Sequence, residues 1–135
     1  MENIFTRVLI KDEMNSILVL QDREDIWNFP GGKLKLGESP TECAISEVEE
    51  ETGIRVLHLT ELFHKYLVFD GIPWMGYFYV ADLVIGVPIM NEPDKIKGMR
   101  FLNSLDLVKF PTELIPINTL LLENPLLHMS STVWN

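Results

Sequence analysis

The chain has 135 residues, of which 47% are hydrophobic and 23% charged, and this is the composition of one ordinary globular domain. Its 20 acidic residues outnumber its 11 basic ones and give a formal net charge of −9. Such a charge disfavours polymeric nucleic acid as a partner, because that binding depends on lysine and arginine contacts to phosphates. The one cysteine, Cys43, excludes an internal disulfide framework and fits a reducing compartment.

The N-terminal stretch, MENIFTRVLIKDEMN, lacks the basic start and the long apolar core of a signal peptide. No apolar run approaches the roughly 20 residues that a membrane-spanning helix needs. We therefore expect a cytoplasmic protein that is a monomer or a homodimer and has no membrane partner.

The chain opens with two short runs rich in β-branched residues, FTRVLI at 5–10 and SILVLQD at 16–22, which predict strands. The polar KDEMN between them predicts that the two strands pair as a hairpin. The next segment, 22–32, begins with polar residues and ends in Pro30-Gly31-Gly32, which is typical of a loop.

The middle of the chain predicts a second, longer hairpin. Two β-like stretches, 56–70 and 73–86, lie on either side of Asp70-Gly71, a dipeptide that favours a tight turn. The segment MRFLN, at 99–103, predicts one more strand after a polar loop at 91–98.

The tail from 110 to 125 has the pattern of a helix, with Pro116 near its start and Asn124-Pro125 at its end. Strands around one early helix, followed by one late helix, predict an α/β sandwich with a mixed sheet. No repeat or linker divides the sequence, so we expect a single domain over 1–135.

The early helix has the clearest signals. Ser39 is a suitable N-cap, Pro40 suits the first helical position, and Glu42 completes a Ser-x-x-Glu capping box. Gly53 suits the left-handed residue just past the helix end. At about 100° per residue, one helix face is predicted to point to a core, and it carries Thr41, Ala44, Ile45, Val48 and Thr52.

Glu47, Glu50 and Glu51 lie on the opposite face, spaced so that their carboxylates converge. A solvated acidic surface is the ordinary interpretation of such a run. However, like charges at this spacing repel, negative charge near a helix C-terminus opposes the macrodipole, and no basic residue lies within the run. A hard divalent cation such as Mg²⁺ would offset the repulsion, since it prefers oxygen ligands and also binds substrate phosphates.

The stretch GKLKLGESPTECAISEVEEETGI, at 32–54, resembles the Nudix box, G-x5-E-x7-R-E-U-x-E-E-x-G-U, in which U is a bulky aliphatic residue. The matching fixed positions are Gly32, Glu38, Glu47, Val48, Glu50, Glu51, Gly53 and Ile54. The resemblance implies the Nudix fold, an α+β protein arranged as an α/β/α sandwich with a mixed β-sheet and helices on both faces.

One fixed position departs from the box, because Ser46 lies where the family has arginine. In the family that arginine braces a catalytic glutamate, and on a helix it lies one turn before Glu50. Serine is too short to make this pair. Four basic residues are candidates to supply a cation instead, and the sequence does not place them: Lys33, Lys35, Arg55 and Lys65.

The resemblance implies that Mg²⁺ or Mn²⁺ is the cofactor, with Glu47, Glu50 and Glu51 as its ligands. The carbonyl of Gly31 is implied as a further ligand. The catalytic residues are then Glu50, the first candidate for activating water, and Glu47. Glu38 is implied to orient the loop or to serve as a secondary ligand.

Residues outside the acidic cluster are candidates for a further ligand and for phosphate contacts. Many Nudix proteins place another acidic residue on a late loop, a position that Glu92 or its rival Asp94 occupies here. Lys33, directly after the glycines, is placed to touch phosphate or to support a carboxylate. Arg23, after the second predicted strand, is a candidate for phosphate, with a plain surface arginine as the alternative.

Aromatic residues near the glycines and in the segment FPTE are candidates for a base pocket. Trp27, Phe29 and Phe110 could stack on a base, or could belong to the core. Glu113, just after the Phe110-Pro step, is a candidate for accepting hydrogen bonds from a purine edge.

The resemblance implies divalent-metal-dependent hydrolysis of a nucleoside diphosphate linked to another moiety X, so the expected partner is a small nucleotide. The chain's small size and FPTE segment favour a nucleoside triphosphate, normal or modified, which yields a monophosphate and pyrophosphate, as in MutT-like members. ADP-ribose, a sugar nucleotide or a dinucleoside polyphosphate are alternative substrates. Ser46 leaves open a third interpretation, a Nudix domain that binds a nucleotide with little turnover.

Overall fold

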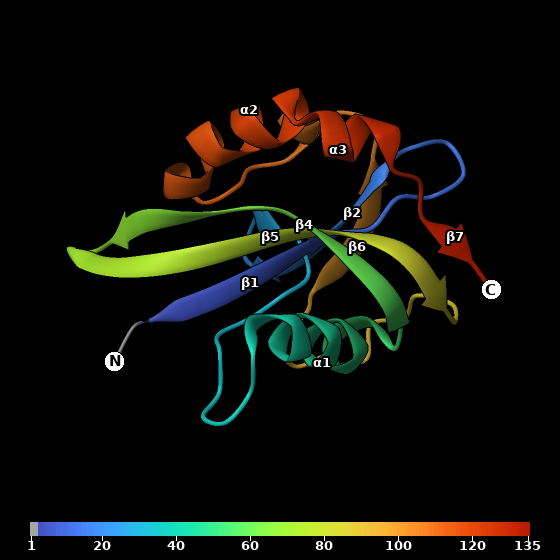
Figure 1. The fold of residues 1–135 in the computed structure, drawn as a ribbon, viewed down its shortest axis with the longest axis horizontal. Helices are drawn as coiled ribbons and strands as arrows, with labels where there is room; N and C mark the ends of the chain where they lie inside the picture. Colours follow the sequence, from blue (N-terminus) through green and yellow to red (C-terminus); the bar gives the residue numbers. More distant parts are fainter. Residues whose placement is uncertain (1–2) are drawn as a thin grey trace.

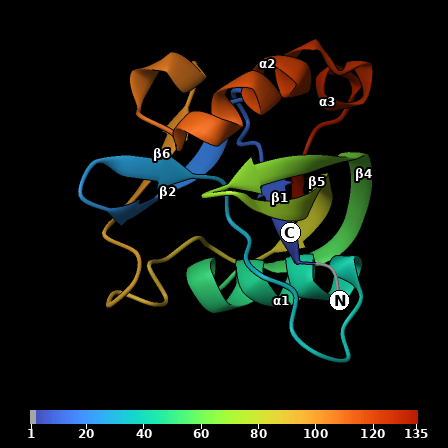
Figure 2. The same cartoon turned by 90° about the vertical axis from the view of Figure 1, so that its left-hand side faces the viewer.

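The computed structural model describes residues 3–135. The β-structure lies in the middle, with helix α1 (Pro40–Thr52) on one face and helices α2 (Ile115–Glu123) and α3 (Pro125–Met129) on the other (Figure 1). Figure 2 shows the same layers from the side. The predicted α/β/α sandwich with helices on both faces is confirmed.

The larger sheet has four strands, three of them in the order β1-β5-β4, with bounds Ile4–Leu9, Ile72–Ile85 and Arg55–Phe69. β1 runs parallel to β5 and β4 runs antiparallel to it, so the sheet is mixed, as predicted. The short β7 (Val133–Trp134) adds to the far end of β5. Asp70 and Gly71 join β4 to β5 with φ angles of 51° and 76°, the left-handed pair that a two-residue hairpin turn requires.

The smaller sheet is antiparallel and has the order β3-β2-β6, with bounds Ile26–Asn28, Ile17–Arg23 and Gly98–Leu102. β6 confirms the strand predicted at MRFLN. β3 corrects the prediction of a loop over 22–32. Glu24 adopts the left-handed region with a φ of 50°, and this turn folds the apolar Ile26 and Trp27 back onto β2.

The predicted hairpin between the first two strands is only partly right. The amide of Leu18 donates to the carbonyl of Ile10 at 2.9 Å, but β1 and β2 then separate into different sheets. The reason is that both edges of β1 are occupied: β5 pairs with one edge, and the glycine-rich segment 30–34 runs along the other.

Helix α1 begins and ends as predicted. The amide of Glu42 donates to the hydroxyl of Ser39 at 3.1 Å, and the amide of Ser39 donates to the carboxylate of Glu42 at 2.9 Å. These two bonds complete the capping box. Gly53 follows the helix in the left-handed region, with a φ of 74°.

Replacing Ser39 with alanine is expected to lower the free energy of unfolding by about 1 kcal/mol, because the Glu42 amide loses its acceptor. Urea-induced unfolding followed by circular dichroism measures this change. Ser131→Ala, at an exposed serine outside any helix, is the matched control and should cost less than half as much. Equal losses in the two variants would contradict the capping role.

The inner face of α1 differs slightly from the prediction. Three of the residues expected to face the core are fully or nearly fully buried, namely Ala44, Val48 and Thr52. Thr41 is exposed, however, and Cys43 is fully buried. The thiol of Cys43 lies 3.5 Å from the hydroxyl of Thr6 and 3.6 Å from the carbonyl of Gly32. The helix therefore packs on both β1 and the glycine-rich segment.

Two apolar cores fill the spaces between the layers. Side chains alternate along β1, so Phe5 and Leu9 lie in the core beneath α2 and α3, while Val8 lies in the core against α1. Two short 3₁₀ turns, Leu105–Leu107 and Thr112–Leu114, lead from β6 to α2. None of the helices within residues 3–135 is long and apolar enough to cross a bilayer.

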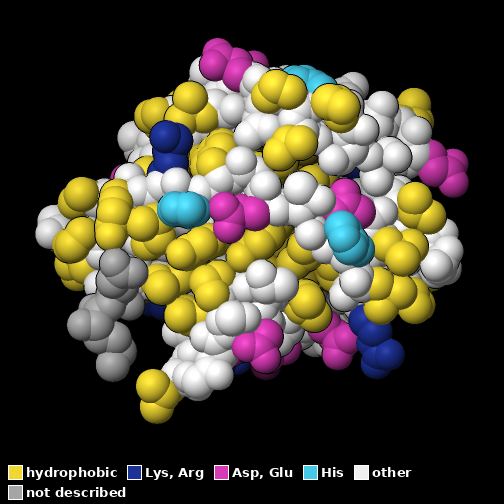
Figure 3. Space-filling view, in the orientation of Figure 1, with side chains coloured by type: hydrophobic (Ala, Val, Ile, Leu, Met, Phe, Trp, Pro, Cys, Tyr) yellow, Lys and Arg dark blue, Asp and Glu magenta, His cyan; other side chains and the backbone are white. Residues whose placement is uncertain are grey.

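The outer side of β4 carries two histidines paired with carboxylates. The Nδ1 atom of His58 lies 2.7 Å from Asp82, and that of His64 lies 3.1 Å from Glu61. Figure 3 shows acidic and histidine side chains interrupting a broad area of hydrophobic atoms on this side of the molecule. Both histidines are thus paired with carboxylates on their own sheet. The candidate functional residues lie elsewhere, in the glycine-rich segment and on α1.

Candidate active site

The glycine-rich segment at 30–34 lies close against β1. The amides of Thr6 and Val8 donate to carbonyls of the segment at 2.9 and 2.8 Å. Gly31 has a φ of 152°, and a Cβ at this position would lie 2.0 Å from the carbonyl oxygen of Thr6. Glycine is therefore required where the segment passes between β1 and the acidic side of α1.

Glu51 is bonded to this segment. One of its carboxylate oxygens accepts a hydrogen bond from the amide of Gly31 at 2.8 Å. Burial raises the pKa of Glu51 to about 7, while the Gly31 amide and the positive charge of Arg7 act in the opposite direction. A cation bound beside Glu51 would favour the ionised carboxylate.

Glu47 and Glu50 converge on one ammonium group. The Nζ atom of Lys35 lies 3.7 Å from Glu47 and 3.4 Å from Glu50. Burial and the charge of Glu50 raise the pKa of Glu47, and Lys35 opposes them. The Glu47 carboxyl also packs on Gly32, where a Cβ would come within 2.5 Å of it. The two carboxylates are thus positioned to share a positive charge.

The chemistry of this region fits a divalent cation. Its donors are hard oxygens: the carboxylates of Glu47 and Glu50, and the carbonyl of Gly31, which no hydrogen bond within residues 3–135 uses. In that part of the chain no three acidic, histidine or cysteine side chains form a complete metal cage. Mg²⁺ does not need one, because it retains waters and combines one or two carboxylates with substrate phosphates.

Glu92 lies on a loop that is fixed to the end of α1. Asn91 holds this loop: its amide donates to the carbonyl of Glu51 at 3.0 Å, and its side-chain amide donates to the carbonyl of Glu50 at 3.1 Å. The negative charge of Glu92 contributes to the raised pKa of Glu47 and of Glu51, so Glu92 is near the cluster. Asp94, the alternative candidate for this further acidic residue, is exposed.

Ser46 does not reach the carboxylates. Its hydroxyl donates to the carbonyl of Cys43, one turn earlier, at 3.2 Å. The cation beside Glu50 comes instead from Lys35, one of the four basic candidates. Glu38 positions that lysine, because its carboxylate accepts a hydrogen bond from the Lys35 amide at 2.8 Å.

A pocket of about 490 Å³ opens on the side of β1 that faces the C-terminal helices, and we call it the aromatic pocket. Its apolar wall includes Phe5, Phe69, Ile72, Trp74 and Leu114. Polar side chains from four separate segments line the rest, among them Arg7, Asn28, Lys33 and Glu113. An aromatic wall with a few polar groups is suited to a flat heteroaromatic ligand.

The sequence candidates for substrate contact occupy different parts of this region. Glu113 and Lys33 line the aromatic pocket, and the Lys33 ammonium lies 5.5 Å from the centre of the Trp74 ring. Lys33 therefore faces the pocket rather than the carboxylates. Arg23 also lines it, but its side chain is 83% exposed, and it pairs loosely with Asp22 at 4.0 Å.

The aromatic candidates lie outside the pocket lining. Phe110 is buried and packs on Phe29, with ring centres 5.1 Å apart, so both belong to the core. Trp27 is half-buried against the same core, and Arg100 covers its ring. The aromatic rings that line the pocket are instead those of Phe5, Phe69 and Trp74, which the sequence did not single out because they lie in ordinary strand patterns.

A smaller hollow of about 150 Å³, which we call the connecting hollow, lies beside the aromatic pocket and is lined by Glu51 of the acidic cluster. The residues that line both spaces are Arg7, Asp22 and Asn28. The connecting hollow also reaches Gly31 and Glu51. The aromatic pocket and the acidic cluster thus lie on either side of this hollow, with Arg7, Asp22 and Asn28 in the wall between the two spaces.

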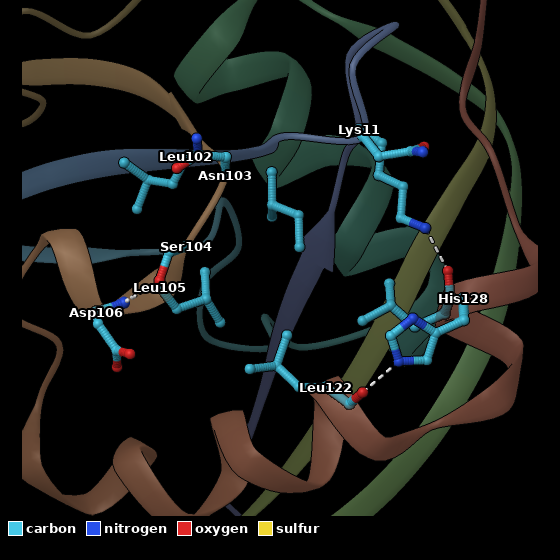
Figure 4. A pocket seen from close by; sticks show the side chains of 11 residues that line it. Lys11, Leu102, Asn103, Ser104, Leu105, Asp106, Leu122 and His128 are labelled. Carbon is cyan, nitrogen blue, oxygen red and sulfur yellow. Dashed lines mark hydrogen bonds between the residues drawn. The ribbon is translucent and has the colours of Figure 1, made fainter.

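Another hollow, shown in Figure 4, lies between the end of β6 and the C-terminal helices. The ammonium of Lys11, which is 5% exposed, donates to the carbonyls of Leu127 and Ser130. The ring of His128 bonds to the carbonyl of Leu122. The basic groups of this hollow, Lys11 and His128, are thus hydrogen-bonded to backbone carbonyls, which is a structural role.

The three layers, the acidic helix beside a glycine-rich segment and the adjoining aromatic pocket define a Nudix-type domain. Residues 4–121 match the family model described as NUDIX domain, and the chain belongs to this family. The resemblance over 32–54 is thereby confirmed.

Two curated relatives and one solved structure illustrate the similarity. The chain is 32% identical over 95 residues to the uncharacterised Nudix hydrolase YvcI of Bacillus subtilis, covering 66% of this chain and 60% of that one. It is 36% identical over 62 residues to the 8-oxo-dGTP diphosphatase of Escherichia coli, covering 42% and 47%. A crystal structure of a MutT Nudix hydrolase from Burkholderia pseudomallei has a TM-score of 0.74 at 25% identity, covering 93% and 98%. The chain thus spans about half to three fifths of the two curated relatives.

Proposed function

We propose that this protein uses Mg²⁺ or Mn²⁺ to hydrolyse a nucleoside diphosphate linked to another moiety X. In the main proposal X is a phosphate group, so the substrate is a nucleoside triphosphate. A normal or modified nucleoside triphosphate would then give a monophosphate and pyrophosphate. The observation that supports this is the connecting hollow, which borders both the aromatic pocket and Glu51 of the acidic cluster. The name of the Escherichia coli relative, 8-oxo-dGTP diphosphatase, is consistent with such a substrate.

The acidic cluster would hold the cation through Glu47, Glu50, Glu51 and the carbonyl of Gly31, with Glu92 nearby. When bound, the metal neutralises phosphate oxygens and makes water a stronger nucleophile. The side chain of Glu50 is 45% exposed and that of Glu47 is 13% exposed. Glu50 is therefore better placed to accept a proton from solvent water, and Glu47 to hold a fixed position.

The aromatic pocket would bind the base. The half-buried Trp74 offers a ring for stacking, and the Glu113 carboxylate can accept hydrogen bonds from the edge of a purine. Lys33 and Arg23 lie at the pocket and supply positive charge toward phosphates. A small nucleotide suits this site, while the net charge of −9 disfavours a polymer.

A substrate panel tests the proposal. Nucleoside triphosphates, 8-oxo-dGTP, ADP-ribose, sugar nucleotides and dinucleoside polyphosphates are each incubated with protein and Mg²⁺, and the products are identified by chromatography. Fast conversion of a triphosphate to monophosphate and pyrophosphate supports the main proposal. Faster cleavage of ADP-ribose or another linked diphosphate supports the alternative substrate class. If nothing is cleaved but a nucleotide raises the melting temperature, the domain is a nucleotide-binding module, the alternative that Ser46 motivates.

Lys35 takes the part of the missing box arginine in this proposal, since it pairs with both Glu47 and Glu50. Lys35→Met is expected to lower kcat by roughly 10- to 100-fold, because a loosened carboxylate is misplaced. Adding Ser46→Arg to Lys35→Met should restore much of the loss. Steady-state kinetics of the single and double variants measure this coupling.

Lys65→Met, at an exposed lysine on β4, is the matched control and should leave kcat within about twofold. Unchanged or faster turnover in Lys35→Met, together with tighter Mg²⁺ binding, would show that the lysine merely takes the place of the metal.

A further inference from the structure

Arg7 interrupts an apolar strand face. Along β1, Phe5 and Leu9 are buried in the core beneath the C-terminal helices, and strand alternation puts Arg7 between them on the same side. A charged residue is rarely buried unless it is paired, so this position calls for an explanation.

The guanidinium of Arg7 lacks a polar partner. Its Nε atom is fully enclosed and makes no hydrogen bond, and no hydrogen bond or salt bridge of this side chain is found within residues 3–135. The guanidinium carbon lies over the ring of Phe5, 5.6 Å from the ring centre. Arg7 as a whole is half-buried. Leaving its enclosed Nε donor without an acceptor is unfavourable, so an acceptor that binds here is favoured.

The position of Arg7 specifies where that acceptor lies. Arg7 lines the aromatic pocket and also the connecting hollow, which extends to Gly31 and Glu51. The negative charge of Glu51 acts on the guanidinium, which places it close to the acidic cluster. A ligand that stacks in the aromatic pocket and reaches the carboxylates must pass this side chain.

We infer that Arg7 binds the phosphate nearest the nucleoside, donating to its oxygens from the wall between the two spaces. The inference rests on the proposed function, in which the base lies in the aromatic pocket and the scissile phosphates lie at the acidic cluster. An anionic phosphate supplies the acceptors that this half-buried guanidinium lacks, and arginine matches phosphate geometry with paired donors. Arg7 thus makes the monophosphate part of the substrate, rather than the base alone, the recognised unit.

A carbonyl oxygen of the base is a second kind of acceptor that could reach Arg7. The two cases differ in what the side chain distinguishes. A phosphate contact separates a nucleotide from its nucleoside, whatever the base. A base-carbonyl contact separates one nucleoside from another and leaves the added phosphate without effect.

Metal-free binding of the four deoxynucleoside 5′-monophosphates and the four deoxynucleosides, measured by titration calorimetry, tests the inference. In the wild type at least one monophosphate should bind roughly 10- to 100-fold more tightly than its nucleoside, the factor expected for hydrogen bonds to charged groups. In Arg7→Met this ratio should fall to near one, with nucleoside binding unchanged. Arg7→Lys should keep part of the ratio.

Two further measurements separate binding from folding. Without ligand, Arg7→Met should melt at the same or a higher temperature, because it removes an unsatisfied Nε donor from a half-buried position without leaving a cavity. A lower melting temperature would show that Arg7 is structural and would overturn the inference. Arg55→Met, which removes an exposed arginine paired with Glu49, is the matched control and should keep the full ratio.

The remaining outcomes are equally decisive. A preserved ratio in Arg7→Met, a changed preference among nucleosides, or a wild type that binds no monophosphate better than its nucleoside would each overturn the inference. The substrate panel with Mg²⁺ is independent of these data. If the wild type cleaves nothing but shows the Arg7-dependent ratio, the hydrolase proposal fails and the phosphate contact stands.

Discussion

Glu50→Gln is expected to lower kcat at least about 100-fold, because the variant loses both a negative ligand and a proton acceptor beside the attacking water. Glu47→Gln should have an effect of similar size. Stopped assays with saturating Mg²⁺ measure kcat, and titration calorimetry with Mg²⁺ measures cation binding. Both should weaken together, since the same oxygens are required for each.

Glu49→Gln is the matched control for these variants. It makes the same change of charge on the same helix, but Glu49 pairs with Arg55 at 3.4 Å, away from Lys35. Its kcat and cation affinity should remain within about twofold of the wild type. If Glu49→Gln is as damaging as Glu50→Gln, general helix charge rather than a specific site controls activity, and the proposed cluster is wrong.

Gly31→Ala is expected to lower the free energy of unfolding by about 3 kcal/mol or more, from steric overlap and backbone strain together. The added Cβ would lie 2.0 Å from the carbonyl oxygen of Thr6, at a φ of 152°. Activity should fall with stability, since the displaced segment loses the bond from the Gly31 amide to Glu51. Urea-induced unfolding and turnover measured on the same samples check both effects.

Gly37→Ala separates steric overlap from backbone strain. Gly37 also has a positive φ, 88°, but a Cβ there would meet nothing within 4 Å. We expect a loss of about 1 kcal/mol from strain alone, with turnover retained. Equal losses at the two glycines would mean that contact with β1 does not position the segment.

Local signals in the sequence were sufficient for the elements whose ends depend on neighbouring residues. Ser39 and Glu42 are three positions apart and bond to each other, and Asp70-Gly71 forms its turn without help from distant residues. The same holds for the acidic helix, whose spacing alone brings Glu47 and Glu50 together. Short-range hydrogen bonds therefore explain why the box and the long hairpin were predictable.

Long-range pairing explains what the sequence did not predict. The sequence predicted a hairpin in which β1 and β2 pair along their length. In the structure they pair only near the turn, because the segment at 30–34 occupies the edge of β1. Asn91 caps the end of α1 from 40 residues away, with no local pattern to indicate it.

Arg7 and Lys35 acquire their specific roles only through the tertiary structure, since the sequence named Lys35 as one of four candidate cations without placing it and did not single out Arg7. Arg7 lies within an ordinary strand pattern in the sequence, yet in the structure it lines both the aromatic pocket and the connecting hollow. Lys35 lies in a loop, and Glu38 turns it toward the carboxylates. Their partners are distant in the chain or outside it, so spacing alone carries no signal.

The buried Lys11, which follows β1, bonds the N-terminal part of the chain to the C-terminal part. The amide of Lys11 donates to the hydroxyl of Thr132 at 2.9 Å, and the indole of Trp134 donates to the Lys11 carbonyl at 2.7 Å. The ammonium of Lys11 donates to the carbonyls of Leu127 and Ser130. The amide, carbonyl and ammonium of this residue therefore all bond to residues among the last nine of the chain. Removing these residues would leave the amide, carbonyl and ammonium of Lys11 without their partners, so the end of β1, the strand beside the glycines, would lose part of its anchorage.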